Sequence, residues 1–391
     1  MKKRTAIFII CYCAYVSIYV ARQNLSLAAP TLKQLEILST AQIGIIGGVF
    51  FVVYACGRLF SSWMSDRLPP YIMIGLGLIT CGISNMLCGS LPLFHLFLLL
   101  WAMNAVAQSM LWGSILRVLS AIYSAEEAKR KASYMGSAVA TGNIMGILVS
   151  SLVIQHLGVS WAFIVPGIIT VLVAIPLIIY TKPVPFQKLE SNSSSNENRL
   201  IKDKDLQNML IPAVIHGVMK DNISLWMAIY ILDKFGMQLE ESTAYMLLIP
   251  ALGFIGRISA PTLYKKCKSN ELILTSYSFL ACVVITLMLI FVPGAAWFAI
   301  VCLSLIYMAV SVINACMLAI FPIRFAKYNQ VASVSGILDF ATYLGTGISS
   351  MFYGALIQML GYESMFVSWA ALSALSFILL HRYSGKSAVK I

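Results

Sequence analysis

Long apolar segments recur along this chain from end to end, and they restrict its fold more than any other feature. A helix that crosses the ~30 Å hydrocarbon core of a bilayer needs about 20 mostly apolar residues. Of the 391 residues, 60% are hydrophobic and 11% are charged, which is typical of membrane proteins. Spans are predicted at about 6–29, 41–64, 71–90, 93–122, 133–156, 160–181, 207–232, 242–264, 271–292, 295–321, 331–358 and 363–383. Because lipid offers no hydrogen bonds to the backbone, we expect an all-α membrane protein with twelve transmembrane helices.

One long polar segment divides these spans six and six. Residues 182–206 contain a run of serine and asparagine together with charges of both signs, a composition typical of a flexible linker. We therefore predict an N-terminal six-helix bundle at 1–181, a cytoplasmic linker at 182–206 and a C-terminal six-helix bundle at 207–391.

The basic residues are distributed unevenly between the predicted loops. Most of the 27 lysines and arginines fall in segments that share one side of the membrane, whereas Lys33 and Lys234 fall on the other side. The positive-inside rule then places both termini in the cytoplasm. It also accounts for the net charge of +12 without a nucleic-acid partner. We expect a multi-pass protein of the cell inner membrane that is embedded in the lipid bilayer and is monomeric.

The two halves of the chain resemble each other. Gly57-Arg58 ends the second predicted span, and Gly256-Arg257 lies in the eighth. Arg22 in the first span and Lys220 in the seventh precede these arginines at nearly the same spacing. This pattern predicts two pseudo-symmetric six-span repeats related by an axis along the membrane normal. Such repeats are typical of transporters whose substrate site lies at the bilayer midplane between the halves.

Arg22 and Lys220 are cations inside apolar spans. A charge at that depth is costly unless it faces a polar cavity or a partner. If both face one central cavity, an anionic ligand between them relieves their mutual repulsion. Arginine can bind such an anion through two parallel hydrogen bonds, whereas lysine acts as a point charge. One alternative is that Arg22 extends its charged end to the interface. Another is that a carboxylate such as Asp221 neutralises Lys220, although neighbouring residues on a helix point about 100° apart.

Asp221 and Asp339 are the acidic residues inside the predicted spans. A buried carboxylate can carry a proton during transport or can balance a cation structurally, and the sequence does not distinguish these roles.

Charged residues also gather near the predicted cytoplasmic helix ends. Asp66 and Arg67 lie between the second and third spans, and Arg58 and Arg117 lie near cytoplasmic ends of spans. Arg257 is the counterpart of Arg58 in the eighth span. Charge pairs at helix ends can hold one conformation and release it in another, so these residues are candidates for a gate. The alternative is that the arginines only set the topology.

Sequence motifs that mark enzyme active sites and nucleotide-binding loops are absent from the sequence. Phosphate-binding glycine loops, HExxH motifs and nucleophile elbows do not occur. The nine cysteines form no CxxC pair or cysteine–histidine cluster, and we expect them to act as packing residues. We therefore expect no enzyme activity, no cofactor and no metal.

A set of aromatic and basic residues resembles the pattern of a known family. The set comprises Tyr15, Tyr19, Arg22, Asn24 and Pro30 in the first span, Tyr54 and Arg58 in the second, Ser65-Asp66-Arg67 and Pro70 after it, Trp112 and Arg117 in the fourth, Tyr307 in the tenth and Tyr343 in the eleventh. In these positions the chain is similar to the organophosphate:inorganic phosphate antiporters of the major facilitator superfamily, which include glycerol-3-phosphate and hexose-6-phosphate transporters.

The resemblance implies alternating access, in which an organic phosphate held by two central cations is exchanged for inorganic phosphate. The chain departs from the family pattern at three positions. Lys220 stands for the second central arginine, and Gln23 stands where the glycerol-phosphate and hexose-phosphate members carry lysine. Gly142, beside Asn143, stands where the family has a fifth-span histidine.

These observations predict a transporter of a small anionic, phosphorylated metabolite. We expect Arg22 and Lys220 to bind it, and the secondary binding candidates are Tyr15, Tyr19, Tyr54, Asn143 and Tyr343. One alternative is a proton-coupled transporter of a carboxylate, zwitterion or drug that uses Asp221 or Asp339. A further alternative is a membrane sensor that binds its ligand without transporting it.

Overall fold

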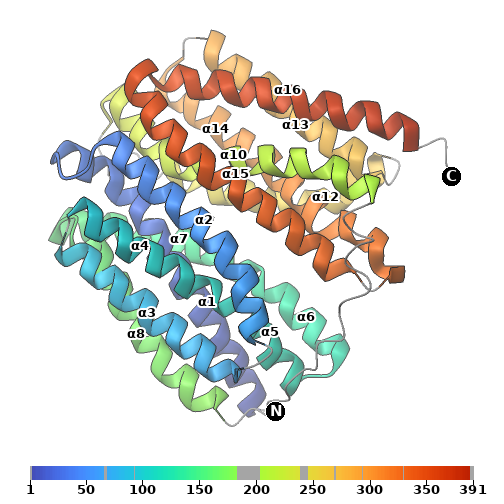
Figure 1. The fold of residues 1–391 in the computed structure, drawn as a ribbon. Helices are drawn as coiled ribbons and strands as arrows, with labels where there is room; N and C mark the ends of the chain where they lie inside the picture. The colour runs from blue at the N-terminus through green and yellow to red at the C-terminus, as the bar shows by residue number, and fades with distance from the viewer. Residues whose placement is uncertain are drawn as a thin grey trace. The chain divides into compact units, whose positions relative to one another are not determined.

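The structure is a computed structural model that describes residues 2–65, 68–91, 93–182, 203–237, 245–267, 270–292, 294–328 and 330–387. All regular elements in these ranges are helices (Figure 1). They form two compact units, Met1–Ser191 and Asn192–Ile391, called here the first and second unit. Most of the predicted linker lies outside the described residues.

The helices of the first unit follow the predicted spans closely. They are α1 (Lys2–Gln34), α2 (Thr40–Ser65), α3 (Pro70–Ser90), α4 (Phe94–Ser109), α5 (Leu111–Ile122), α6 (Ala125–Met135), α7 (Ser137–Leu157) and α8 (Trp161–Thr181). The fourth predicted span is divided into α4 and α5, because the amide of Met110 bonds to the carbonyl of Ala107, three residues back, in a tight turn. The short charged helix α6 precedes the fifth span.

The second unit repeats this order. It contains α10 (Lys204–Phe235), α12 (Leu248–Lys266), α13 (Glu271–Phe291), α14 (Ala296–Ala315), α15 (Val331–Leu360) and α16 (Tyr362–Ser387). A π-helical turn at Cys316–Ile320 and a 3-10 segment at Phe321–Tyr328 extend α14. The eighth predicted span begins at residue 242, and residues 238–244 lie outside the described part of the chain.

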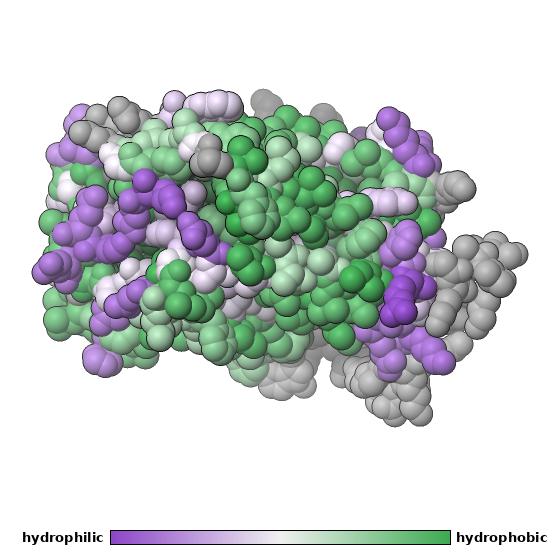
Figure 2. Space-filling model, turned by 90° about the horizontal axis from the view of Figure 1, so that it is seen from above, coloured by the Kyte–Doolittle hydropathy of each residue, from purple (hydrophilic) through white to green (hydrophobic). Residues whose placement is uncertain are grey.

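Helix length and composition identify this as a multi-pass membrane protein. Within the described ranges, 9 helical segments are long and apolar enough to cross a membrane. Helices α10, α12 and α15 are not among them, and each carries charged residues within its span, such as Lys220, Arg257 and Asp339. Large apolar side chains, including Phe352 and Met359, are well exposed. Figure 2 shows extensive hydrophobic surface of this kind, which suits contact with lipid tails.

The two units share one scheme of helix pairing. In the first unit α1 packs on α7, α2 on α4 and α3 on α8; in the second, α10 packs on α15, α12 on α14 and α13 on α16. In both units the first span therefore meets the fifth, the second meets the fourth, and the third meets the sixth. This confirms the predicted fold class of two pseudo-symmetric six-helix bundles.

The repeated Gly-Arg pair has a structural role in both units. A Cβ added at Gly57 would lie 2.6 Å from the Oγ of Ser109 on α4. A Cβ added at Gly256 would collide with the backbone carbonyl of Met308 on α14. Each glycine therefore allows the second span of its unit to pack closely against the fourth.

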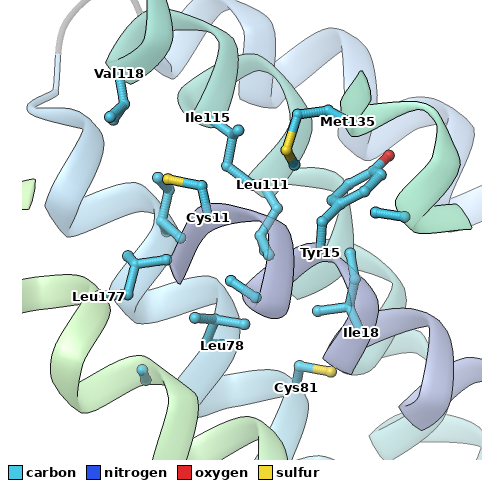
Figure 3. Packing of buried hydrophobic residues seen from close by; sticks show 14 of the residues in the cluster. Cys11, Tyr15, Ile18, Leu78, Cys81, Leu111, Ile115, Val118, Met135 and Leu177 are labelled. Carbon is cyan, nitrogen blue, oxygen red and sulfur yellow. The ribbon is translucent and has the colours of Figure 1, made fainter. Parts of the chain in front are cut away.

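The core of the first unit gathers around the beginning of α1. Figure 3 shows Cys11, Tyr15 and Ile18 of α1 directed toward apolar side chains of α3, α5 and α8. Among the packed neighbours are Leu78, Leu111 and Leu177, all fully buried. This core fixes the rotation of α1 about its axis. It therefore also fixes the directions in which Tyr19 and Arg22, which follow on the same helix, project.

Candidate functional site

Arg22 lies in a cluster of aromatic rings contributed by α1 and α2. Its guanidinium carbon is 4.8 Å from the ring centroid of Phe50, 4.9 Å from that of Tyr54, 5.0 Å from that of Phe51 and 5.6 Å from that of Tyr19. Distances below about 6 Å allow cation–π attraction. We call these five residues the Arg22 cluster. The structure thus places a half-buried cation against apolar rings within the membrane-spanning part of the first unit.

Two of the predicted binding tyrosines, Tyr19 and Tyr54, belong to this cluster, and Tyr15 adjoins it. The ring of Tyr15 is buried 5.4 Å from Tyr19 and 5.1 Å from Trp112, centroid to centroid. Arg58, one turn after Tyr54 on α2, donates a long hydrogen bond of 3.5 Å to the Tyr54 hydroxyl. The sequence resemblance had grouped these tyrosines, and the fold of the first unit brings them together.

The close packing of α7 on α1 places Asn143 near this region. A Cβ at Gly142 would collide with Tyr19, and one at Gly146 would lie 2.7 Å from the Cβ of Gln23. Asn143 follows Gly142 on α7 and is half-buried. A larger residue at position 142 would therefore displace Tyr19 or separate the two helices.

Lys220 lies on α10 of the second unit and has two described partners. Its Nζ is 3.7 Å from Oδ2 of Asp221 and 4.5 Å from the ring centroid of Tyr343 on α15. We call these three residues the Lys220 cluster. On sequence grounds this pairing with Asp221 was the alternative to anion binding, although adjacent helix positions diverge by about 100°. The lysine side chain has four methylene groups, and its length overcomes that divergence.

A seam of polar contacts joins α10 to α14 and α15 beside Lys220. His216, one turn before Lys220, is fully buried, with Nε2 3.2 Å from the carbonyl oxygen of Val310. Asn222 donates a hydrogen bond of 2.8 Å to Ser349 of α15. Sequence reasoning missed both residues. The available signal was the presence of a histidine and an asparagine in the same apolar span as Lys220.

Asp339 lies on α15 and is half-buried. It precedes Tyr343 by one helical turn, so the two side chains share a helix face. Because α15 packs along α10, Asp339 belongs to the same helix pair as the Lys220 cluster.

The candidate gate residues have different surroundings. Arg58 and Arg117 are half-buried in the first unit, whereas Arg257 is exposed on α12. Asp66 and Arg67 lie outside the described residues. The gate therefore stays a prediction.

A charge network that the sequence analysis did not identify occurs near the start of α10. Arg324, in the 3-10 segment, pairs with Asp205 at 2.9 Å and with the buried carboxylate of Glu271. The Tyr383 hydroxyl of α16 donates a hydrogen bond of 2.7 Å to Asp205. These contacts tie four separate elements of the second unit at one end. The residues are too far apart in the sequence for a motif to reveal them.

Within the described ranges no group of three or more His, Cys, Asp or Glu side chains lies close enough to hold a metal ion. The nine cysteines are free thiols, and six of them are buried.

Comparison with known sequences gives one family match that covers most of the chain. The family model described as Major Facilitator Superfamily matches residues 11–337. A probable hexose phosphate transport protein of Chlamydia trachomatis is 30% identical over 182 residues, which are 46% of this chain and 40% of that protein. The membrane sensor protein UhpC of Salmonella typhimurium is 30% identical over 168 residues, 43% of this chain and 38% of that protein. The phosphoglycerate transporter protein of Salmonella typhimurium is 25% identical over 179 residues, 44% of this chain and 38% of that protein. Each match therefore spans less than half of the relative.

Solved structures resemble the whole chain in fold. The occupied, inward-facing structure of a bacterial homolog of the human lysosomal transporter Spinster has a TM-score of 0.78 at 16% identity, covering 98% of this chain and 97% of that one. The nucleoside transporter NupG has a TM-score of 0.76 at 12% identity, covering 98% and 99%. At such identities the likeness establishes the fold.

Proposed function

Because the chain belongs to the Major Facilitator Superfamily, we propose that the solute it carries is a small anionic, phosphorylated metabolite. Family membership makes the protein a secondary transporter of the membrane and confirms the expectation that it is not an enzyme.

The observation that carries the proposal is a cation held against tyrosine in the first span of each unit. Arg22 lies against Tyr19 and Tyr54. Lys220 occupies the corresponding helix of the second unit and lies against Tyr343. A cation removed from water gains most from an anionic ligand, and tyrosine hydroxyls add hydrogen bonds to phosphate oxygens.

The named relatives support phosphate as the anionic group. Proteins described as hexose phosphate, phosphoglycerate and glycerol-3-phosphate transporters each match part of this chain at 25–30% identity. All three solutes combine a small carbon skeleton with a phosphate ester. We infer that the solute of this chain shares that chemistry.

In the proposed mechanism Arg22 and Lys220 are the cations that bind the phosphate group, as the sequence analysis predicts. Arginine would make the bidentate contact, and lysine would add a single charged donor. Tyr15, Tyr54 and Asn143 would complete the polar lining. Inward- and outward-facing states would alternate around the bound anion, in exchange for inorganic phosphate.

We further propose that both termini lie in the cytoplasm and that the protein resides in a cell inner membrane. The excess of lysine and arginine on one side of the predicted spans supports this orientation. The residues proposed to gate the cytoplasmic side are Arg58, Asp66, Arg67, Arg117 and Arg257, as the sequence predicts.

The direct test is exchange in liposomes loaded with inorganic phosphate. We expect labelled glycerol 3-phosphate or hexose 6-phosphate to enter the parent vesicles, and we expect entry to be lost with Arg22→Ala and Lys220→Ala. Lys234→Ala is a matched control, because Lys234 also lies on α10 but forms an exposed ion pair with Glu363. Equal exchange by all the variants would refute the assigned site.

A membrane sensor is a second candidate, supported by the 30% identity to UhpC. A sensor would bind a phosphate ester saturably in vesicles without accumulating it. Accumulation above the external concentration, driven by a phosphate gradient, would exclude that role. Proton-coupled transport of another solute stays a prediction, and collapse of the pH gradient would abolish it while sparing an exchanger.

A further inference from the structure

In the structure, the cation assigned to anion binding in the second unit is already paired with an anion. Nζ of Lys220 lies 3.7 Å from Oδ2 of Asp221, and the two side chains are only 17% and 24% exposed. Charges this close attract strongly where little water screens them. A phosphate group that approaches Lys220 therefore meets a site whose charge is locally balanced.

The geometry leaves little room for both anions. The other described contact of Nζ is the face of the Tyr343 ring, at 4.5 Å, which occupies a second side of the ammonium group. A carboxylate and a phosphate next to one lysine would also repel each other. The favourable arrangement is one in which the incoming anion takes the place of Asp221.

We propose that Asp221 is an internal competitor for the anion at Lys220, and that anion binding transfers one proton from a water molecule to Asp221, with release of hydroxide to the solvent. The contact between Lys220 and Asp221 breaks, a contact between Lys220 and the bound anion forms, and the released carboxylate gains an O–H bond. The net charge of the cluster with its ligand is then one unit more positive than without the proton. This inference rests on the proposed function, because it assumes that an anion binds at Lys220.

Apart from Lys220, neither α10 near Asp221 nor α15 carries a lysine or arginine that could form a new ion pair with Asp221. His216 is buried one turn before Lys220, and its Nε2 contacts the carbonyl oxygen of Val310. On α15 the titratable groups are Tyr343, already in contact with Lys220, and Asp339, one helical turn before Tyr343.

The other helices packed on α10 offer no cation at this level in the described ranges. Tyr307 of α14 packs against α12 at Gly253, and α14 itself contains no lysine or arginine. Helix α16 contacts α10 along its length, through Tyr383 on Asp205, Ser373 on Met219 and Glu363 on Lys234, and its residues 364–380 include no charged side chain. Lys234 lies 13 residues beyond Asp221, which is about 20 Å along a helix. A displaced Asp221 is therefore stabilised most simply by taking up a proton.

The proposal predicts a measurable linkage between anion affinity and pH. If binding takes up one proton, the apparent dissociation constant rises up to about tenfold for each unit increase in pH. Asp221→Asn has nearly the same shape but no carboxylate. In that variant we expect tighter anion binding at pH 8. We also expect the slope of the logarithm of the dissociation constant against pH to fall by up to about one log unit per pH unit.

The experiment measures thermal stabilisation of the purified full chain by inorganic phosphate and by glycerol 3-phosphate, from pH 6 to pH 8. The parent is compared with Asp221→Asn, with Asp221→Glu, which restores the carboxylate, and with Asp233→Asn, which makes the same change elsewhere on α10. Both ligands titrate in this range, but their own ionisation is common to all four proteins. The difference in slope therefore isolates Asp221. A pH-indicator dye in weak buffer reports proton uptake on mixing.

We expect proton uptake and the steep slope in the parent, in Asp221→Glu and in Asp233→Asn, and loss of both in Asp221→Asn. If Asp221→Asn binds phosphate with the slope of the parent, the inference is wrong and the proposed function stands. Weaker binding by Asp221→Asn at pH 8 would also overturn it, because removal of a competitor cannot weaken binding. If neither ligand stabilises any of the four proteins, both the inference and the proposed function fail.

Discussion

The close approach of α10 and α15 allows a quantitative test of the second unit. A Cβ added at Gly217 would collide with the carbonyl oxygen of Thr342 and lie 2.7 Å from its carbonyl carbon. These are backbone atoms, so no side-chain rotation relieves the contact. At the same level the Thr346 hydroxyl donates a hydrogen bond of 2.7 Å to the Gly217 carbonyl. Gly217→Ala must therefore push the two helices apart.

The loss of stability expected for Gly217→Ala can be isolated by comparison with a second glycine, Gly336. Overpacking by one methyl group costs about 1–3 kcal/mol, while replacement of glycine by alanine inside a helix gains up to about 1 kcal/mol. A Cβ at Gly336 of α15 has no neighbour within 4 Å, so Gly336→Ala shows the helical gain alone. The two variants should therefore differ in their free energy of unfolding by the cost of overpacking alone, about 1–3 kcal/mol.

The assay is thermal unfolding of each variant, followed by phosphate exchange in liposomes. We expect Gly217→Ala to melt at least about 2 °C below Gly336→Ala. We also expect it to exchange more slowly, because α10 carries Lys220 and α15 carries Tyr343. Equal melting temperatures would refute the conclusion that these backbones are in contact.

Three further predictions concern charged residues. Arg22→Lys keeps the charge but removes the planar fork, so we expect about tenfold weaker phosphate-ester binding, measured by ligand-induced stabilisation, because one good charged hydrogen bond is worth about 1.5 kcal/mol. Asp339→Asn should leave phosphate exchange intact, since the exchanger we propose needs no proton carrier there; loss of transport only under a pH gradient would instead support the proton-coupled alternative. Arg324→Gln leaves the carboxylate of Glu271 buried without its described cation, and we expect a loss of about 2 kcal/mol in a denaturation assay, because the arginine is one-third exposed and screened.

Controls for these predictions come from the same unit. Lys234→Ala removes a cation whose ion pair is exposed, and its effect on stability should be below about 1 kcal/mol. If Arg324→Gln is as mild as Lys234→Ala, the Glu271 pair contributes no more than a surface ion pair. If Arg22→Lys binds phosphate esters as the parent does, the fork geometry of Arg22 is not used.

Much of the fold could be predicted because lipid makes strong local demands on a sequence. The third span was predicted at 71–90 and forms α3 at Pro70–Ser90. The Gly-Arg repeat indicated two similar halves, and each glycine lies at the corresponding helix contact. The break at Met110 was not predicted, because the fourth predicted span has no proline and its one glycine, Gly113, comes after the break.

The candidate site could be predicted only in part. Tyr19, Tyr54 and Arg22 were grouped by a resemblance, and the structure places them in contact. The rings of Phe50 and Phe51 were missed, because a phenylalanine in an apolar span has no distinguishing local signal. The role of Asn143 and of the gate residues stays a prediction.

By itself, the sequence determined that this is a helical membrane protein with two related halves and a cation in the first span of each. Those features are local, because each membrane span must satisfy its own backbone hydrogen bonds and each intramembrane charge stands out against apolar neighbours. Only the tertiary structure decided the partners of those charges. Arg324 reaches Glu271 across 53 positions of the chain, and Lys220 meets Tyr343 on a different helix. Contacts between segments distant in sequence depend on the packing of whole helices, which hydrophobic periodicity does not specify.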